Sequence, residues 1–373
     1  MDALKPGATI GILGGGQLGR MSALAAARLG YRCHVFAPEA DSPGMLVAAA
    51  RTVAPYEDEA ALAAFARACD VVTFEFENVP ARVLEVLEPL VQCRPGVEAL
   101  RICQDRLAEK AFLESVGVAV APWRAVRDEA ELAAAIAAIG LPAVLKTTRL
   151  GYDGRGQAVL RRPEDAAPAF ARLAPHPLIL EAFVPFAAEV SAIAARGVDG
   201  SVAVFDAVEN RHSAAHILEL SFAPARVPPA VAEAARENVR RVAEGLGLVG
   251  VVALEMFLLP DGRLLGNEIA PRPHNSGHWT IEACLASQFE QHVRAVAGLP
   301  LASPERHSDA VMRNLIGPEG LARWPALLRM PGVAPHLYGK AEARPGRKLG
   351  HATRLLPRGA LAAVGEAEAL GGL

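Results

Sequence analysis

The first hundred residues alternate short apolar runs with segments whose apolar positions recur at helical spacing. The apolar runs predict strands at residues 9–13, 32–36 and 71–74. The helical spacing predicts helices at residues 17–29, 62–68 and 81–90. Strands that alternate with helices are typical of a parallel sheet, so we expect a Rossmann-like domain in this part of the chain.

The rest of the chain has a mixed pattern of helices and strands. The predicted helices are residues 105–116, 128–139, 230–246 and 279–297. The predicted strands are residues 143–146, 158–160, 249–258 and 263–269, with several more in residues 178–209 around a turn at Asp199 and Gly200. Beyond residue 297 the chain is rich in Pro, Gly and Arg and carries short strand signals, which predicts a small third domain.

Length and composition exclude several classes of protein. A chain of 373 residues is long enough for two or three domains, and its formal net charge of −3 argues against an extended nucleic-acid-binding face. No apolar run reaches the roughly 18 residues of a membrane span, and the N-terminus lacks the flanks of a signal peptide. The five cysteines form no CxxC pair, so we expect thiols in a reducing cytoplasm.

Lysine is scarce in this chain. Of the 38 basic residues only five are lysine: Lys5, Lys110, Lys146, Lys340 and Lys348. Because the sequence otherwise uses Arg, each lysine is a candidate for a position that needs a compact point charge. The alternative is that some of these lysines persist by chance.

A glycine-rich turn joins the first predicted strand to the first helix. Residues 11–20 read GILGGGQLGR and contain Gly14-x-Gly16-x-x-Gly19, with Glu39 about 20 residues further on. This spacing is typical of a dinucleotide-binding turn, which would indicate an oxidoreductase. The alternative is a turn that packs the helix on the sheet or binds another ligand, and nothing downstream resembles hydride-transfer machinery.

A second glycine-rich segment follows Lys146. This lysine ends an apolar strand, and the loop after it reads LGYDGRGQ. A lysine held by a strand beside a loop of exposed backbone N–H groups is an arrangement that can clamp phosphates. It is not a Walker A loop, because the GxxxxGK[ST] order is absent. The alternative is an ordinary hairpin loop.

Glu255 and Glu268 form the sharpest candidate pair. If Asp261 and Gly262 make a two-residue turn, the two glutamates face each other on adjacent strands. Like charges in that position are destabilising, and a divalent cation resolves the conflict. Carboxylate oxygens together with substrate phosphates suit magnesium. The alternatives are two exposed glutamates in another register, or a salt bridge to Arg263.

A polar stretch leaves the strand of Glu268. Residues 267–279 read NEIAPRPHNSGHW, in which Arg272, His274 and Asn275 offer a cation and hydrogen-bond donors. Near a metal these groups can bind an anionic substrate. The alternative is a plain polar loop.

Together these segments resemble the ATP-grasp superfamily. Within it, GGGQLGRM, TFEFENVP, DRLAEK, GYDGRGQ, NEIAPRPHNSGHWT and YGKAEARPGRKLGHAT are similar to motifs of the 5-(carboxyamino)imidazole ribonucleotide synthases of purine biosynthesis. The matching segments run from Gly11 to Thr353, nearly the whole chain. A related formyl-transferring ligase has a similar NExxPRPH stretch, but its loop lacks Tyr-Asp and its tail differs.

The resemblance implies an α/β and α+β architecture in three parts. These are a Rossmann-like domain at residues 1–104, a two-lobed ATP-grasp domain at 105–300 and a small β domain at 301–373. The implied reaction joins ATP, bicarbonate and 5-aminoimidazole ribonucleotide through carboxyphosphate, giving 5-(carboxyamino)imidazole ribonucleotide, ADP and phosphate. The family also implies a homodimer.

The resemblance further implies a role for each motif residue. Magnesium would be held by Glu255 and Glu268. The residues implied to contact ATP are Arg106, Lys146, Gly151, Gly154, Gly156, Gln157, Glu181, Ala182, Phe183, Val184, Glu189, His212, Asn267 and Glu268. Those implied to surround bicarbonate are Tyr152, Asp153, Arg155, Arg272, His274 and Asn275. The aminoimidazole nucleotide would be bound by Gln17, Glu75, Lys340, Arg347 and, as a helper, Lys348.

Two other classes of protein compete with this interpretation. An NAD(P)-dependent oxidoreductase would use the GGGQLG turn for its cofactor, and nicotinamide binding would reveal it. A non-catalytic nucleotide-binding module would lack one of the two magnesium carboxylates, whereas this sequence has both.

Overall fold

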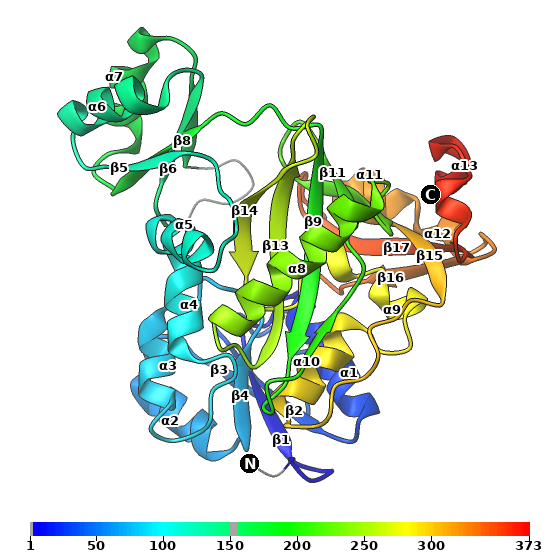
Figure 1. The fold of residues 1–373 in the computed structure, drawn as a ribbon. Coiled ribbons are helices and arrows are strands. Elements are labelled where there is room, and N and C mark those ends of the chain that lie inside the picture. Colours follow the sequence, from blue (N-terminus) through cyan, green and yellow to red (C-terminus); the bar gives the residue numbers. More distant parts are fainter. Residues whose placement is uncertain (1–2, 150–155) are drawn as a thin grey trace.

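A computed structural model describes residues 3–149 and 156–373, which form three sheets with helices packed against them. In Figure 1 the N-terminal sheet lies at the bottom, in blue. A small lobe with strands β5, β6 and β8 stands apart at the upper left, and the largest sheet occupies the centre and right. Within the described residues, no helix has the length and hydrophobicity needed to cross a membrane.

The N-terminal sheet is parallel, with the strand order β3-β2-β1-β4. Its strands are β1 (Thr9–Leu13), β2 (Arg32–Ala37), β3 (Ala50–Val53) and β4 (Val71–Phe74). The helices of this region are α1 (Gln17–Arg28), α2 (Glu59–Arg67), α3 (Ala81–Leu87) and α4 (Val97–Gln104). The predicted Rossmann-like pattern is confirmed, although β3 and α4 were not predicted.

The small lobe is an antiparallel sheet covered by two helices. Its strands, in the order β5-β8-β6-β7, are β5 (Trp123–Val126), β8 (Leu178–Ala182), β6 (Ala143–Thr147) and β7 (Gln157–Leu160). Helices α6 (Glu129–Ile139) and α7 (Ala166–Leu173) contribute Leu132 and Leu173 to its apolar core. Lys146 therefore lies near the end of a central strand of this lobe.

The largest sheet has nine strands in the order β14-β13-β9-β11-β12-β15-β17-β16, with β10 beside β9. Its strands are β9 (Ala188–Arg196), β10 (Val202–Val204), β11 (Val208–His212), β12 (Leu218–Ala223), β13 (Gly250–Leu258), β14 (Leu264–Ala270), β15 (Ser308–Ile316), β16 (Val333–Leu337) and β17 (Lys348–Pro357). Helix α8 (Pro229–Gly245) packs on β9 and β13 through an apolar stripe that includes Val231, Ala235 and Val242. Strands β15 to β17 of the C-terminal segment extend this sheet.

The remaining helices are short. They are α5 (Arg106–Ser115), α9 (Thr280–Ala283), α10 (Gln288–Val296), α11 (Gly317–Ala322), α12 (Trp324–Leu327) and α13 (Glu366–Leu370). Short 3₁₀ turns lie at Pro163–Asp165, Asn275–Gly277 and Ala360–Ala362.

The prediction of one helix at residues 279–297 is wrong. The structure breaks it into α9 and α10, because Cys284 leaves the helix to form a β-bridge with Arg306. Ser287 then caps the N-terminus of α10, its Oγ accepting a hydrogen bond from Glu290 N–H at 3.2 Å. Ser followed three residues later by Glu is an N-cap signal that the apolar periodicity had masked.

We expect Ser287→Ala to lower the free energy of unfolding by about 1 kcal/mol, the usual cost of removing an N-cap oxygen. Urea unfolding followed by circular dichroism measures this change. Ser287→Asp retains a capping oxygen and should stay near the wild-type value. An unchanged Ser287→Ala midpoint would show that the cap contributes nothing.

Candidate active site

The two glutamates singled out in the sequence lie on neighbouring strands of the largest sheet. Glu255 of β13 stands directly opposite Glu268 of β14, so the predicted pairing is confirmed. The predicted two-residue turn is wrong, because Leu259 N–H donates to Arg263 O at 2.9 Å and leaves three residues, 260–262, between them. A β-bulge next to Glu255 compensates for the extra turn residue and restores the pairing.

The bulge also decides which side chains reach the site. Gly266 is opposite Met256 and Glu268 is opposite Glu255, so Asn267 is the extra residue of β14. In a regular strand Asn267 and Glu268 would point to opposite faces of the sheet. A bulge places two residues opposite one, which re-aims a side chain. Asn267 accordingly lines a recess together with Glu255.

The paired carboxylates have the chemistry of a cation site. Burial, and after it the charge of Glu268, raise the pKa of Glu255 to about 7. The second of these causes is the electrostatic conflict expected of two carboxylates that face each other. Because oxygen ligands suit magnesium, the donor set fits the metal that the resemblance implies.

His274 lies against Glu255. The imidazole Nε2 is 3.2 Å from Glu255 Oε1, while Nδ1 accepts the backbone N–H of Ser276 at 3.3 Å. The proton is therefore assigned to Nε2, which donates to the carboxylate. Burial, and after it the charge of Arg272, hold the pKa of His274 well below its usual value. A neutral His274 can orient Glu255 as a hydrogen-bond donor.

Glu181, at the end of β8, is buried between two lysines. Lys146 Nζ lies 3.0 Å from Glu181 Oε1, and Lys110 Nζ lies 3.4 Å from Oε2. Burial raises the pKa of Glu181, but the charges of Lys110 and Lys146 outweigh burial and hold it at about 2. Lys146 thus enters the site from the strand end that the sequence predicts.

The segment after Glu181 joins the two lobes. The N–H of Ala182 donates to Pro122 O at 2.8 Å, and that of Phe183 donates to Pro142 O at 3.1 Å. The N–H groups of Ala182 and Phe183 therefore already have hydrogen-bond partners within the protein. The next backbone N–H along the chain is that of Val184. Phe183 is itself exposed at the surface.

Glu189 and His212 face each other across β9 and β11. His212 Nδ1 lies 2.5 Å from Glu189 Oε2, and both residues line the recess that holds Asn267 and Glu255. Burial lowers the pKa of His212, but the hydrogen bond and charge of Glu189 outweigh it and raise the pKa above its usual value. The structure therefore gathers these four predicted residues at one place.

Arg106 completes this side of the site. It is the first residue of α5, after Asp105, whose carboxylate caps the helix by accepting Leu107 N–H at 3.0 Å. The Arg106 guanidinium lies 3.9 Å from Glu268.

Gly156 and Gln157 lie at the start of β7. Gln157 is the first residue of this strand, and the carbonyl of Gly156, just before it, accepts Thr147 N–H at 2.9 Å.

Five of the predicted site residues cannot be placed. Gly151, Tyr152, Asp153, Gly154 and Arg155 lie outside the described residues.

Arg272 and Asn275 are engaged by neighbours that the sequence did not indicate. The guanidinium of Arg272 forms an ion pair with Glu77, from the TFEFENVP segment. The amide of Asn275 is buried against Asn314, with Nδ2 donating to Asn314 Oδ1 at 3.0 Å. Both contacts join segments far apart in the chain, so no local spacing could reveal them.

A second, larger site lies between the N-terminal sheet and the C-terminal segment. This cavity of about 530 Å³ is lined by the glycine turn with Gln17, by Tyr56, Glu75 and Phe76, and by Lys340, Arg344 and Arg347. Glu75 accepts the backbone N–H of Gly19 at 2.8 Å and also that of Gly16. A Cβ at Gly16 would lie 2.4 Å from the Glu75 carboxylate, so this turn requires glycine there. In the described part of the chain, Lys348 is not part of this lining.

Lys340 is held in this cavity with a depressed pKa. Burial, the nearby Arg347 and more weakly Lys348 lower the pKa of Lys340 to about 8, although Glu75 opposes them. Lys340 therefore loses its charge as the pH rises through about 8. A phosphate ligand would favour the protonated form.

We expect kcat/KM for a phosphate-bearing substrate of this cavity to fall above about pH 8, because neutral Lys340 no longer attracts the anion. The pH profile of the wild type, compared with that of Lys340→Ala, tests this expectation. The kcat/KM of Lys340→Ala should be lower than that of the wild type below pH 8 and should not decline near pH 8. The same decline in both proteins would assign it to another group.

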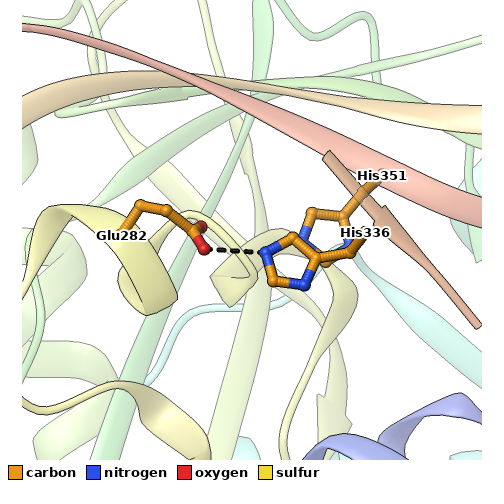
Figure 2. A group of neighbouring side chains, drawn as sticks. All are labelled: Glu282, His336 and His351. Carbon is orange, nitrogen blue, oxygen red and sulfur yellow. Dashed lines mark hydrogen bonds and ion pairs between the residues drawn. The ribbon is translucent and has the colours of Figure 1, made fainter. Parts of the chain in front are cut away.

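A third group of titratable side chains lies at Glu282, His336 and His351 (Figure 2). His336 Nε2 is 2.7 Å from Glu282 Oε1, and the two imidazoles stack with 4.5 Å between centroids and 10° between planes. Imidazole lone pairs lie in the ring plane, so stacked parallel rings do not aim them at one ion. We therefore assign this group to tying β16 and β17 to α9.

Three family models match successive parts of the chain. A ribonucleotide synthetase preATP-grasp domain matches residues 7–104, an ATP-grasp domain matches residues 111–289, and a phosphoribosylaminoimidazole carboxylase C-terminal domain matches residues 310–362. The fold and the site therefore define an ATP-grasp enzyme. The three matches follow the order of the predicted domains along the chain.

Similar proteins narrow the class further. The chain is 52% identical to the N5-carboxyaminoimidazole ribonucleotide synthase of Brucella melitensis, over 95% of this chain and 98% of the relative. An ADP complex of an N5-carboxyaminoimidazole ribonucleotide synthetase superposes with a TM-score of 0.92 at 43% identity, covering 97% and 96% of the two chains. An Aspergillus clavatus enzyme solved with ADP and 5-aminoimidazole ribonucleotide superposes with a TM-score of 0.88 at 34% identity, covering 94% of each chain. The chain belongs to the N5-carboxyaminoimidazole ribonucleotide synthases, ligases of purine biosynthesis.

Proposed function

We propose that this enzyme carboxylates 5-aminoimidazole ribonucleotide, using ATP and bicarbonate and releasing ADP and phosphate. The observation that carries the proposal is the presence of two sites of different chemistry. One joins a facing pair of carboxylates to Lys146 and Arg106, and the other places Lys340 and Arg347 across from the glycine turn. The first suits a nucleoside triphosphate with its cation, and the second suits a nucleoside monophosphate.

In the first site, we assign the ATP phosphates to Arg106 and Lys146 and the ribose hydroxyls to Glu189, with His212 beside it. Because the N–H groups of Ala182 and Phe183 already have carbonyl partners, the adenine edge falls to the N–H of Val184. Gly156, Gln157 and Asn267 border the phosphates, as do Gly151 and Gly154 by the resemblance. Glu255 and Glu268 would hold magnesium, which when bound neutralises phosphate charge and orients the transferred group.

Bicarbonate is a poor electrophile, so its oxygen first attacks the γ-phosphorus of ATP and ADP leaves. The resulting carboxyphosphate breaks its C–O bond and releases phosphate and carbon dioxide inside the site, shielded from water. The exocyclic amine of the ribonucleotide then forms a bond to the carbon of carbon dioxide and loses a proton. Arg272, His274 and Asn275 are assigned to this centre, as are Tyr152, Asp153 and Arg155 by the resemblance.

In the second site, we assign the ribonucleotide phosphate to Lys340 and Arg347 and the aminoimidazole to Gln17 and Glu75. The glycine turn supports this without any dinucleotide, because the N–H groups of Gly16 and Gly19 already donate to the Glu75 carboxylate. Lys348 begins β17, and its charge acts on the pKa of both Glu255 and Lys340. It is therefore placed to act between the two sites.

The decisive experiment measures phosphate release from ATP with bicarbonate, with and without 5-aminoimidazole ribonucleotide. We expect fast release only when all three substrates and magnesium are present. Titration with NAD and NADP serves as the control for the alternative use of the glycine turn. A rate of phosphate release that does not change when the ribonucleotide is added would contradict the proposal. Tight binding of NAD or NADP would contradict it as well.

We also propose that the enzyme is a homodimer of the cytoplasm. The resemblance supports the dimer, and the five free thiols support a reducing compartment. Analytical ultracentrifugation tests the first statement, with a single species at the monomer mass as the contradicting result.

A further inference from the structure

Lys110 is the one buried lysine to which the proposed function assigns no substrate. It lies on α5, where it and its neighbour Glu109 are each only 1% exposed. Burying two ionisable side chains is costly unless each is paired or hydrogen-bonded. Their partners therefore indicate what they do.

The partners of both side chains lie on the bulged strand β14. This strand is at the edge of the sheet, and its outer side meets the 119–120 segment at one point, where Gly266 forms a β-bridge with Val120 and its N–H donates to Ala119 O at 2.7 Å. Lys110 Nζ donates to Asn267 O at 2.8 Å and to Gly266 O at 3.4 Å. Glu109 Oε1 accepts the N–H of Ile269 at 2.6 Å. Beyond the bridge at Gly266, two side chains of one helix thus bind the outer backbone groups of Asn267 and Ile269, on both sides of Glu268.

We propose that Glu109 and Lys110 are positioning residues that hold the bulge of β14, and thereby aim Asn267 and Glu268 into the ATP–magnesium site. A bulge leaves one residue without a regular ladder partner and bends its strand. Without side chains to bind its carbonyls and N–H, the edge could relax to a regular register. A shift by one residue would turn either Asn267 or Glu268 to the opposite face.

Lys110 also connects the bulge to the other lobe. Its ammonium group lies 3.4 Å from Glu181 of β8, the carboxylate that also pairs with Lys146. The positive charge of Lys110 therefore shares Glu181 with Lys146. If Lys110 were removed, Glu181 would attract Lys146 more strongly and draw it away from a phosphate.

The geometry explains why a lysine stands at this position. Two carbonyl oxygens and a carboxylate surround one nitrogen, and an ammonium group has three donors that can rotate toward them. A planar guanidinium presents its donors in a fixed fork. Arginine, which this chain otherwise prefers, would not satisfy the same three acceptors.

This inference rests on the proposed ATP–magnesium site, and its test uses Lys110→Met and Lys110→Arg in the full-length protein. We expect both variants to raise the KM for ATP and the magnesium concentration for half-maximal activity at least about tenfold. The KM for the ribonucleotide, bound in the separate cavity, should stay within about twofold. Calorimetric titration with ADP and magnesium should show the same weakening without any turnover.

Arg306→Met is the control for the loss of a partly buried cation with ion-pair partners. Arg306 pairs with Asp309 at 3.0 Å and lines neither site. The Arg306→Met substitution should lower the thermal midpoint and leave the KM for ATP unchanged. If the Lys110 variants behave in the same way, Lys110 is merely structural and the inference is overturned. A Lys110→Arg variant with the wild-type KM for ATP and the wild-type magnesium dependence would also overturn the inference.

Glu109 supplies a second, independent arm. Glu109→Gln retains a carbonyl oxygen that can accept Ile269 N–H, whereas Glu109→Leu does not. We expect the Gln variant to keep the wild-type KM for ATP and the Leu variant to raise it. Equal values in both variants would contradict the role of Glu109. If the wild-type protein itself released no ribonucleotide-dependent phosphate, the proposed function would fail instead.

Discussion

Glu268→Gln is expected to lower kcat at least about 100-fold, the scale of losing roughly 2.7 kcal/mol of transition-state stabilisation. The substitution keeps the shape of the side chain but removes the charge that balances a cation between β13 and β14. Phosphate release at saturating ATP, bicarbonate and ribonucleotide, with magnesium varied, measures the loss. Magnesium activation should also shift to higher concentration.

Glu219→Gln is the matched control, because Glu219 is an exposed glutamate on β12 of the same sheet. It should have wild-type constants. Near-normal kcat of Glu268→Gln at saturating magnesium would remove Glu268 from the metal site. Loss of thermal stability in Glu268→Gln would indicate misfolding, but relief of carboxylate repulsion is expected to leave or raise the midpoint.

Arg347→Ala is expected to raise the KM for 5-aminoimidazole ribonucleotide by roughly 10- to 150-fold, because a charge-assisted hydrogen bond contributes about 1.5–3 kcal/mol. Pro345 and Gly346 form the predicted turn, in which Gly346 has a φ of +75° and Arg347 N–H donates to Arg344 O at 3.1 Å. The turn brings Lys340 and Arg347 to one cavity. Steady-state kinetics with the ribonucleotide varied measures the effect.

The KM for ATP should remain nearly unchanged in Arg347→Ala, since the nucleotide site lies on other elements. Arg358→Ala, which removes an exposed arginine paired with Glu305, controls for a general loss of positive charge. An unchanged ribonucleotide KM in both Lys340→Ala and Arg347→Ala would take the C-terminal segment out of the substrate site.

The facing glutamates show how far local reasoning reaches. The sequence predicted that Glu255 and Glu268 pair, and the structure confirms it, although the turn has one residue more than predicted. The bulge that restores the pairing is bound by Glu109 and Lys110, about 160 residues earlier in the chain. Turn residues can be identified locally, but the contacts that hold a bulge depend on which helix packs against the strand.

The sequence by itself determined the N-terminal alternation of strands and helices, the order of the motifs and the residue types of both sites. These follow from side-chain periodicity and from the chemistry of Glu, Lys and Gly, which act over a few residues. The tertiary structure alone decided that β15 to β17 join the central sheet and that Glu181 lies between Lys110 and Lys146. Buried charges are paired by segments that meet only when the lobes fold together, so their partners cannot be derived from spacing along the chain.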